Sequence, residues 1–246
     1  MGNVRDIFYI SANFEESYFI YYGMEFHEFV KHCSIPLKNI LVTDGFGVAN
    51  HYNRDWCLET ANGKDDILEL AKEDIYGLGN FHWVDYDNQE HLNNSTPKEK
   101  AEVLYLSHFG TPLKTPFIQS LHNNFFYLAH DDGWFCKLYC KDMNAFKDII
   151  GNKIVACLSA DKRRHIAPMS EEIPKLLLDL TKKGLLIDFS TIRKESNGLS
   201  LNFYATCHYL DMDEMYRNIQ KDKQNAEIKG TIRHMKGTWY INFYEA

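Results

Sequence analysis

Hydrophobic and polar positions alternate most regularly near the C-terminal end of the chain. Residues 238–244 place Trp239, Ile241 and Phe243 on one face of an extended segment and Tyr240, Asn242 and Tyr244 on the other. A period of two residues is typical of a β-strand. Together with residues 226–234 and the Lys236-Gly237 turn, the pattern predicts a C-terminal hairpin.

Comparable apolar runs predict further strands. They lie at residues 6–10, 38–43, 81–86, 185–192 and 199–209. A second hairpin is predicted at residues 124–139, because the dipeptide Asp132-Gly133 between two aromatic runs suits a tight turn.

Helical spacing of apolar residues, with capping signals, predicts helices at residues 65–75, at about 142–158, around residue 177 and after Asp211. The clearest start is Thr96-Pro97-Lys98-Glu99, a capping box with proline at the first helical position. We expect the helix that follows to bury a face containing Ala101, Leu104, Tyr105 and His108.

The aromatic segment after Asn13 is also predicted to be helical, with Asn13 as its cap and Glu16 reaching back to the cap amide. Its apolar residues cover more than one side, so this helix is expected to be central or covered by a partner. They are Tyr18, Phe19, Tyr21, Tyr22, Phe26, Phe29 and Val30. Gly23 within the segment indicates a bend or a close backbone approach.

These elements predict an α+β protein with mostly antiparallel sheets and packed helices. The run Lys162-Arg163-Arg164-His165 precedes Pro168 and marks a candidate boundary, either as a solvated linker or as a site for an anion. We therefore expect an acidic, aromatic unit at residues 1–160 and a smaller unit at residues 166–246.

Charge is distributed unevenly between the two predicted units. Residues 1–165 contain 16 Lys and Arg against 23 Asp and Glu, whereas residues 166–246 contain 11 of each. All of the net charge of −7 thus lies in the first part. We expect no nucleic-acid partner, because nonspecific binding requires Lys and Arg to neutralise phosphates, and a basic partner or a cation matches better.

Three further features of the sequence predict that the protein is cytoplasmic. Apolar runs stop at about five residues, far below the ~20 that span a bilayer, so no membrane partner is expected. The N-terminal segment lacks a signal-peptide pattern, and the six cysteines contain no CxxC pair. Cys136 and Cys140 are interpreted as buried small hydrophobic residues.

The best candidate for chemistry is the predicted hairpin tip, His130-Asp131-Asp132-Gly133, although a turn alone also explains these residues. A metal-assisted hydrolase could combine His130 and Asp132 with Asp85 of the strand at 81–86. His82 points to the opposite side of that strand from Asp85 and Asp87. We expect no resident metal or other cofactor, and no nucleotide-binding or nucleophile motif is complete.

A second set of candidate residues concerns ligand binding. Glu25 and His27 interrupt the aromatic segment and, two residues apart, cannot share a helix face. If Glu25 points inward, it is a candidate acid or cation anchor. The alternative is a satisfied or exposed carboxylate. Tyr22 and Trp134 are the other candidate ligand-binding residues.

Three segments resemble a family of uncharacterised proteins of Bacillus and its relatives. They are residues 21–27 (YYGMEFH), 75–85 (IYGLGNFHWVD) and 127–135 (YLAHDDGWF). Members are sometimes labelled oxalate:formate antiporters, a label that the absence of apolar membrane-length runs contradicts here. The resemblance implies a bacterial cytosolic setting and transfers no site residue.

Two functional hypotheses follow. The first is a cytosolic binding or regulatory protein that recognises a protein or small molecule through its aromatic, acidic N-terminal part, without transport activity. The second is a metal-assisted hydrolase that uses Asp85, His130 and Asp132. A thiol-dependent enzyme is a third possibility, and it requires a cysteine with a depressed pKa.

Overall fold

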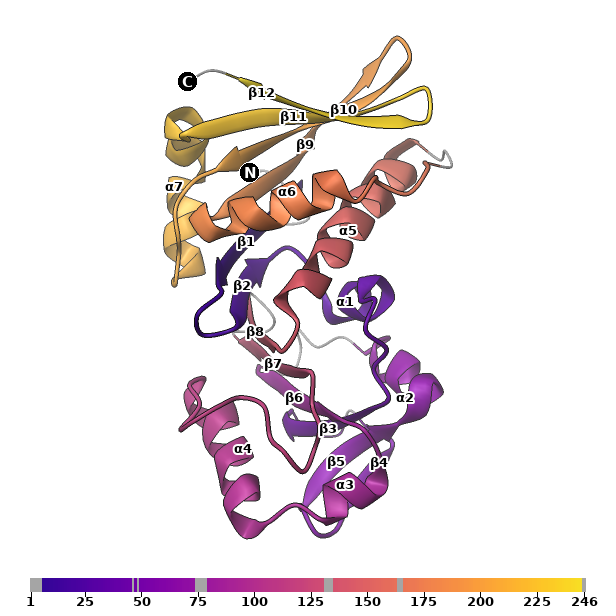
Figure 1. Cartoon of the computed structure of the whole chain (residues 1–246), viewed down its shortest axis with the longest axis vertical. Helices are drawn as coiled ribbons and strands as arrows, with labels where there is room; N and C mark the ends of the chain where they lie inside the picture. Colours follow the sequence, from indigo (N-terminus) through magenta and orange to yellow (C-terminus); the bar gives the residue numbers. More distant parts are fainter. Residues whose placement is uncertain are drawn as a thin grey trace.

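A computed structural model of the chain describes residues 6–45, 47, 49–73, 79–130, 135–162 and 166–244. These residues form an α+β protein, as predicted (Figure 1). Its strands are β1 Ile7–Asn13, β2 Tyr18–Tyr22, β3 Asn39–Asp44, β4 His51–Asn53, β5 Leu58–Asn62, β6 Phe81–Tyr86, β7 Phe125–His130, β8 Phe135–Cys140, β9 Leu185–Glu195, β10 Gly198–Ala205, β11 Ile228–Met235 and β12 Thr238–Tyr244. Its helices are α1 Phe26–His32, α2 Gly63–Leu70, α3 Gln89–Asn93, α4 Pro97–Phe109, α5 Phe146–Lys162, α6 Glu172–Leu180 and α7 Met212–Asn225, with short 3₁₀ turns at Met143–Ala145 and Thr181–Lys183.

The twelve strands of the described residues form one sheet in the order β12-β11-β10-β9-β1-β2-β8-β7-β6-β3-β5-β4. Neighbouring strands are antiparallel, as predicted. The pairing of β1 with β9, where Phe8 lies opposite Ile187, connects the unit predicted at residues 1–160 to the unit predicted at 166–246. The division between these units stays a prediction.

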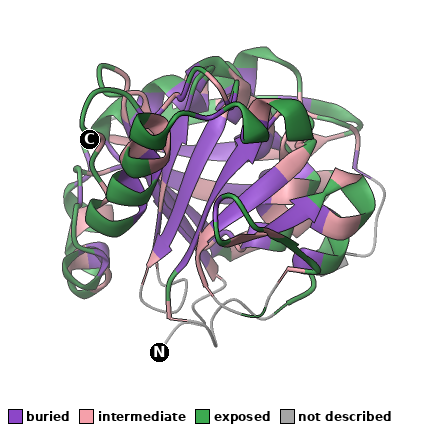
Figure 2. Cartoon of the chain, turned by 90° about the horizontal axis from the view of Figure 1, so that it is seen from below, coloured by how far each residue is buried: buried purple, intermediate pink, exposed green. Residues whose placement is uncertain are grey.

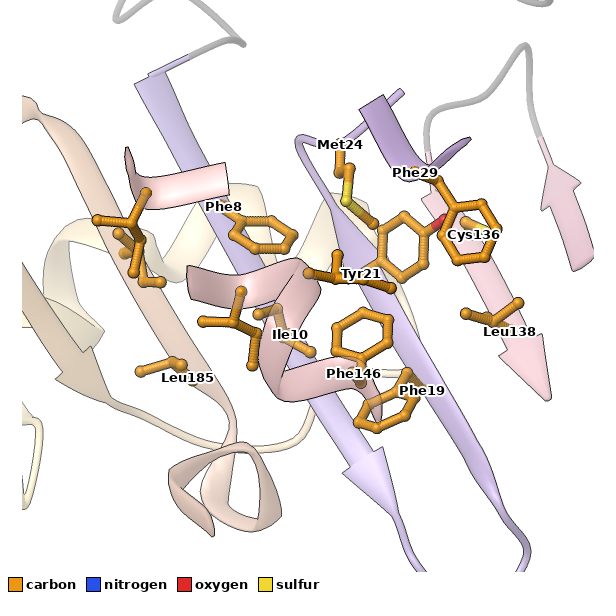
Figure 3. Packing of buried hydrophobic residues seen from close by; sticks show 14 of the residues in the cluster. Phe8, Ile10, Phe19, Tyr21, Met24, Phe29, Cys136, Leu138, Phe146 and Leu185 are labelled. Carbon is orange, nitrogen blue, oxygen red and sulfur yellow. The ribbon is translucent and has the colours of Figure 1, made fainter. Parts of the chain in front are cut away.

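One face of the sheet carries the main hydrophobic core. Helices α1, α2, α5 and α6 contribute buried side chains to this core, which runs from Ala61 on β5 to Trp239 on β12. At its centre the ring of Phe19 on β2 stacks on Phe146 of α5 with 4.0 Å between ring centroids (Figure 3). Phe8 and Leu185, from the neighbouring strands β1 and β9, lie beside them.

The opposite face has two smaller cores. Helices α3 and α4 cover one of them through Leu92, Val103 and Leu106. Helix α7 covers the other through Met212, Met215 and Ile219. Figure 2 shows the buried strands between the exposed outer sides of the helices.

The helix predicted after Asn13 is wrong in its first half, because residues 18–22 form strand β2 and α1 begins only at Phe26. The side chain of Asn13 does accept the amides of Glu15 and Glu16, but it does so in the turn between β1 and β2. Strand β2 is buried almost throughout, so its sequence shows a continuous apolar run rather than alternation.

Gly23 is a close-approach position, one of the two options predicted for it. Its φ is +85°, and a Cβ atom placed there would lie 1.9 Å from the carbonyl oxygen of Ile7. A side chain at this position would therefore separate β1 from the chain that leaves β2.

Several other predictions are confirmed. The strand at residues 81–86, the hairpins β7–β8 and β11–β12, and the capping box of Thr96 and Glu99 are present. Cys136 and Cys140 are both buried, as interpreted. The short strands β4 and β5 were not predicted, because three and five residues give too little pattern.

Candidate functional site

The predicted hairpin tip is only partly described. His130 is the last residue of β7 and Phe135 the first of β8, and the two lie opposite each other in the sheet. Residues 131–134 are outside the described residues, so Asp132 and Trp134 have no position here. Their roles stay predictions.

Asp85 is buried on the main-core side of β6, and its carboxylate is held by the chain that enters β7. Its Oδ1 accepts the amides of Phe125 at 2.6 Å and of Asn124 at 2.9 Å, and its Oδ2 accepts the Asn124 side chain at 3.3 Å. Burial raises the pKa of Asp85 to about 6, although these hydrogen bonds oppose the shift. The geometry gives Asp85 a role in fixing the start of β7.

Asp85 and His130 do not meet. Phe81 and Trp83 share the main-core face with Asp85, whereas Leu128 lies in the core under α4, on the same face as His130. Asp85 also lies near the start of β7 and His130 at its end. The two predicted hydrolase residues that the structure describes, Asp85 and His130, are therefore not brought together.

A different polar cluster, the His82 cluster, lies where β3 and β7 end and β6 begins. Its centre is His82, which is 2% exposed. His82 Nδ1 lies 3.2 Å from the Ser107 hydroxyl of α4 and 3.7 Å from the Asp44 carboxylate. The ring of His130 crosses that of His82 at 70° with 4.7 Å between centroids.

Burial lowers the pKa of His82 to about 4; the neighbouring His130 lowers it too, while Asp44 opposes the shift. His82 is therefore neutral at neutral pH, with one donor and one acceptor nitrogen. Its Nε2 has no hydrogen-bond partner among the described residues. The cluster thus holds a buried, neutral imidazole beside a hydroxyl, a carboxylate and a second imidazole.

The His82 cluster differs from a Ser-His-acid triad. In a triad the serine and the acid lie at different ring nitrogens of the histidine. Here Ser107 and Asp44 are both nearest to Nδ1, and the Ser107 side chain is buried. The arrangement does not support nucleophilic catalysis by Ser107. No local motif in the sequence could have revealed this cluster, because its members come from four separate elements.

Glu25 lies at the N-cap of α1 rather than inside a helix. It forms a capping box with Glu28, and its carboxylate lies 3.0 Å from His27 Nδ1. The two residues were predicted not to share a helix face, and their contact is compatible with that prediction because Glu25 precedes the helix, which begins at Phe26. Tyr22, the other described member of the predicted binding set, is buried at the end of β2, in the core under α7.

Helices α1 and α5 share a buried ion pair that the sequence did not reveal. Lys153 Nζ donates to Glu28 Oε1 at 2.5 Å, and the Lys153 side chain is 6% exposed. Burial acts to raise the pKa of Glu28, but the Lys153 ammonium outweighs it and the pKa lies below its ordinary value. The pair connects two helices of the main core.

The apolar face predicted for α4 is exposed, which corrects the prediction. The helix buries Val103, Leu106 and Ser107 instead. The residues left outside, which we call the α4 stripe, are Ala101, Leu104, Tyr105, His108 and Phe109. Leu104 is 45%, Tyr105 37% and Phe109 59% exposed, and Leu113 just after the helix is 56% exposed.

Comparisons with known proteins leave the chain without a family. No family model, no curated protein and no solved structure matches it. The resemblance to the Bacillus-type family therefore stays a prediction. Among the described residues, no three His, Cys, Asp or Glu side chains are placed to hold one metal ion, and no helix is long and apolar enough to cross a membrane.

Proposed function

We propose that the protein is a cytoplasmic binding or regulatory protein that recognises another protein through the α4 stripe. The observation that carries this proposal is that α4 presents apolar residues to solvent although its opposite side already packs into the core. Helices of globular proteins usually have a single apolar face, and a second one indicates a contact surface.

The residue types in the α4 stripe favour a protein partner. The rings of Tyr105 and Phe109 lie 4.5 Å apart, and His108 packs edge-on against Phe109. Aromatic residues are enriched at protein interfaces and supply much of the binding energy there. Leu113 extends the apolar area beyond the end of the helix.

Charge defines the partner further. The first 165 residues carry all of the net charge of −7. The electrostatic field of this negative charge attracts basic surfaces from a distance and repels acidic ones. The proposed partner therefore presents an apolar patch surrounded by Lys and Arg.

The test compares two variants with matched exposure. Phe109→Glu places a charge in the α4 stripe, and Tyr52→Glu places one at Tyr52 of β4, which is 60% exposed. A partner captured from extract of the source organism is purified and titrated against both variants and the unmodified chain. We expect Phe109→Glu to weaken its binding at least tenfold, which corresponds to about 1.4 kcal/mol.

The control variant Tyr52→Glu should bind the partner as tightly as the unmodified chain does. Added salt should weaken partner binding by the control variant and by the unmodified chain. Equal binding by all three proteins, or a chain that stays monomeric and captures nothing, contradicts the proposal. Self-association through the stripe also contradicts it, because the occupant is then a second copy of the chain.

A further inference from the structure

The sheet face of β10–β12 that lies opposite the main core combines aromatic and basic side chains. On β12, Trp239 and Ile241 face the main core, so Tyr240, Asn242 and Tyr244 face away from it. Tyr240 is 48% and Tyr244 49% exposed. These strands form one end of the molecule (Figure 1).

The strand register aligns these side chains in rows across the sheet. The first row contains Arg193, Ser200, Arg233 and Tyr240, one from each of β9 to β12. The second contains Asn202, Thr231 and Asn242. The third contains Tyr204, Lys229 and Tyr244. We call these three rows the aromatic-basic face.

The face has a local excess of positive charge. Arg193 is exposed in the first row, and Lys229 is in the third. Arg233 Nε lies 3.3 Å from Glu195, the acidic neighbour of the first row. The buried Asp188 beside the second row pairs with Lys223 of α7 at 2.6 Å.

Helix α7 leaves the β12 part of this face uncovered, and it contacts the third row where Lys229 Nζ donates to the carbonyl oxygen of Gln224. Its buried residues pack into a core that reaches only as far as Tyr204 on β10. The rings on β12 are therefore open to a ligand, and the hydroxyl of Tyr244 is held in place by a hydrogen bond with Thr231.

We propose that the aromatic-basic face binds a short single-stranded nucleic acid. Bases stack on Tyr240 and Tyr244, which lie about 13 Å apart along one strand. Phosphates contact Arg193, Arg233 and Lys229, and the exposed amide of Asn242 lies between the two rings on the same strand, where base edges need donors and acceptors.

This proposal goes beyond the proposed protein-binding function and uses a surface at the other end of the sheet. The net charge of the whole chain predicts no nucleic-acid partner, but that charge lies entirely in the first 165 residues. An aromatic sheet face suits splayed bases, whereas a duplex hides its base faces within the stack.

The experiment measures binding of a fluorescent oligo(U) of roughly ten nucleotides, within the length that such surfaces usually cover. The full-length chain is titrated at several salt concentrations, alongside Tyr240→Ala and Arg193→Ala. The matched controls are Tyr52→Ala and Arg54→Ala, an exposed tyrosine and an exposed arginine at the other end of the sheet.

We expect Tyr240→Ala to weaken binding by roughly 5- to 100-fold, the range for loss of one stacked base. The logarithm of affinity should fall with the logarithm of salt concentration with a slope of about −2, as three phosphate contacts predict, and less steeply in Arg193→Ala. Both control variants should bind as the unmodified chain does.

Absence of binding at low salt overturns the proposal. Equal affinity of Tyr240→Ala and the unmodified chain overturns it as well, because stacking then contributes nothing. If poly-glutamate or duplex RNA competes as well as oligo(U) does, the face attracts polyanions by charge alone and the proposal fails.

Discussion

At the scale of single residues, His82 is a titratable side chain that the fold keeps neutral. Burial lowers its pKa to about 4, against an ordinary value near 6.5. The unfolded chain therefore binds a proton at a higher pH than the folded chain, and folding stability decreases as pH falls from about 6.5 to about 4. We expect His82 to account for a loss of about 2 kcal/mol between pH 7 and pH 5.

Urea unfolding at pH 7 and pH 5 checks this expectation. In His82→Gln the loss between the two pH values should be smaller by that amount, because glutamine does not titrate. His51→Gln, which changes a half-exposed histidine, serves as the control. The same pH dependence in His82→Gln and the unmodified chain would show that His82 is not buried in a neutral form. Burial also lowers the pKa of His32 to about 4, so His32 adds the same pH dependence to the free energy of unfolding of all three proteins.

Lys153 is a second residue with a measurable role. Lys153→Met leaves Glu28 without its partner between α1 and α5, and we expect it to lower the free energy of unfolding by about 3 kcal/mol. Lys147→Met is the control on the same helix, because its partner Glu171 is largely exposed and exposed pairs contribute less than about 1 kcal/mol. If chemical denaturation shows that the two variants lose the same free energy of unfolding, Lys153 and Glu28 do not form a buried ion pair. Adding Glu28→Met to Lys153→Met should recover part of the loss.

The sequence could not reveal these residue-scale features. His82, Ser107 and Asp44 belong to three elements, and only the pairing of β3 with β6 and the packing of α4 bring them together. Asp85 shows the converse. Its alternation with His82 was correctly predicted, but its partners at the start of β7 depend on strand order, which a local pattern does not encode.

At the scale of elements, α4 shows how a correct helix can be given the wrong buried face. The capping box located its start, and Gly110 in the left-handed region ends it. The helix has apolar residues on two sides, so the sequence allows either side to face the core. Packing against the sheet buries the side that contains Val103 and Leu106. For β2, burial on both faces removed the alternation that identifies a strand.

A matched pair of substitutions measures which face of α4 is the core. Leu106→Ala should lower the free energy of unfolding by about 2–5 kcal/mol, because a buried side chain leaves a cavity. Leu104→Ala, two positions away in the exposed stripe, should change it by less than about 0.5 kcal/mol. Thermal or urea unfolding of both variants decides between the faces. A larger cost for Leu104→Ala would restore the sequence-based assignment.

At the scale of the whole molecule, the continuous sheet joins the two units that charge and composition predict. Strand β1 belongs to the first unit, yet it pairs with β9 of the second, and one apolar core contains side chains from both. The α4 stripe and the aromatic-basic face lie toward opposite ends of this sheet. The two proposed binding surfaces are therefore separate.

The pairing of β1 with β9 leads to a prediction about cooperativity. If the sheet is one folding unit, urea unfolding gives a single transition with the same midpoint by circular dichroism and by tryptophan fluorescence. Gly184→Ala destabilises the second unit directly, because a Cβ atom there would lie 2.0 Å from the carbonyl oxygen of Cys207 at a φ of +82°. The variant should shift the midpoint measured by both probes equally. Two separate transitions, with only one of them moved by Gly184→Ala, would instead show that residues 1–160 and 166–246 fold as independent domains.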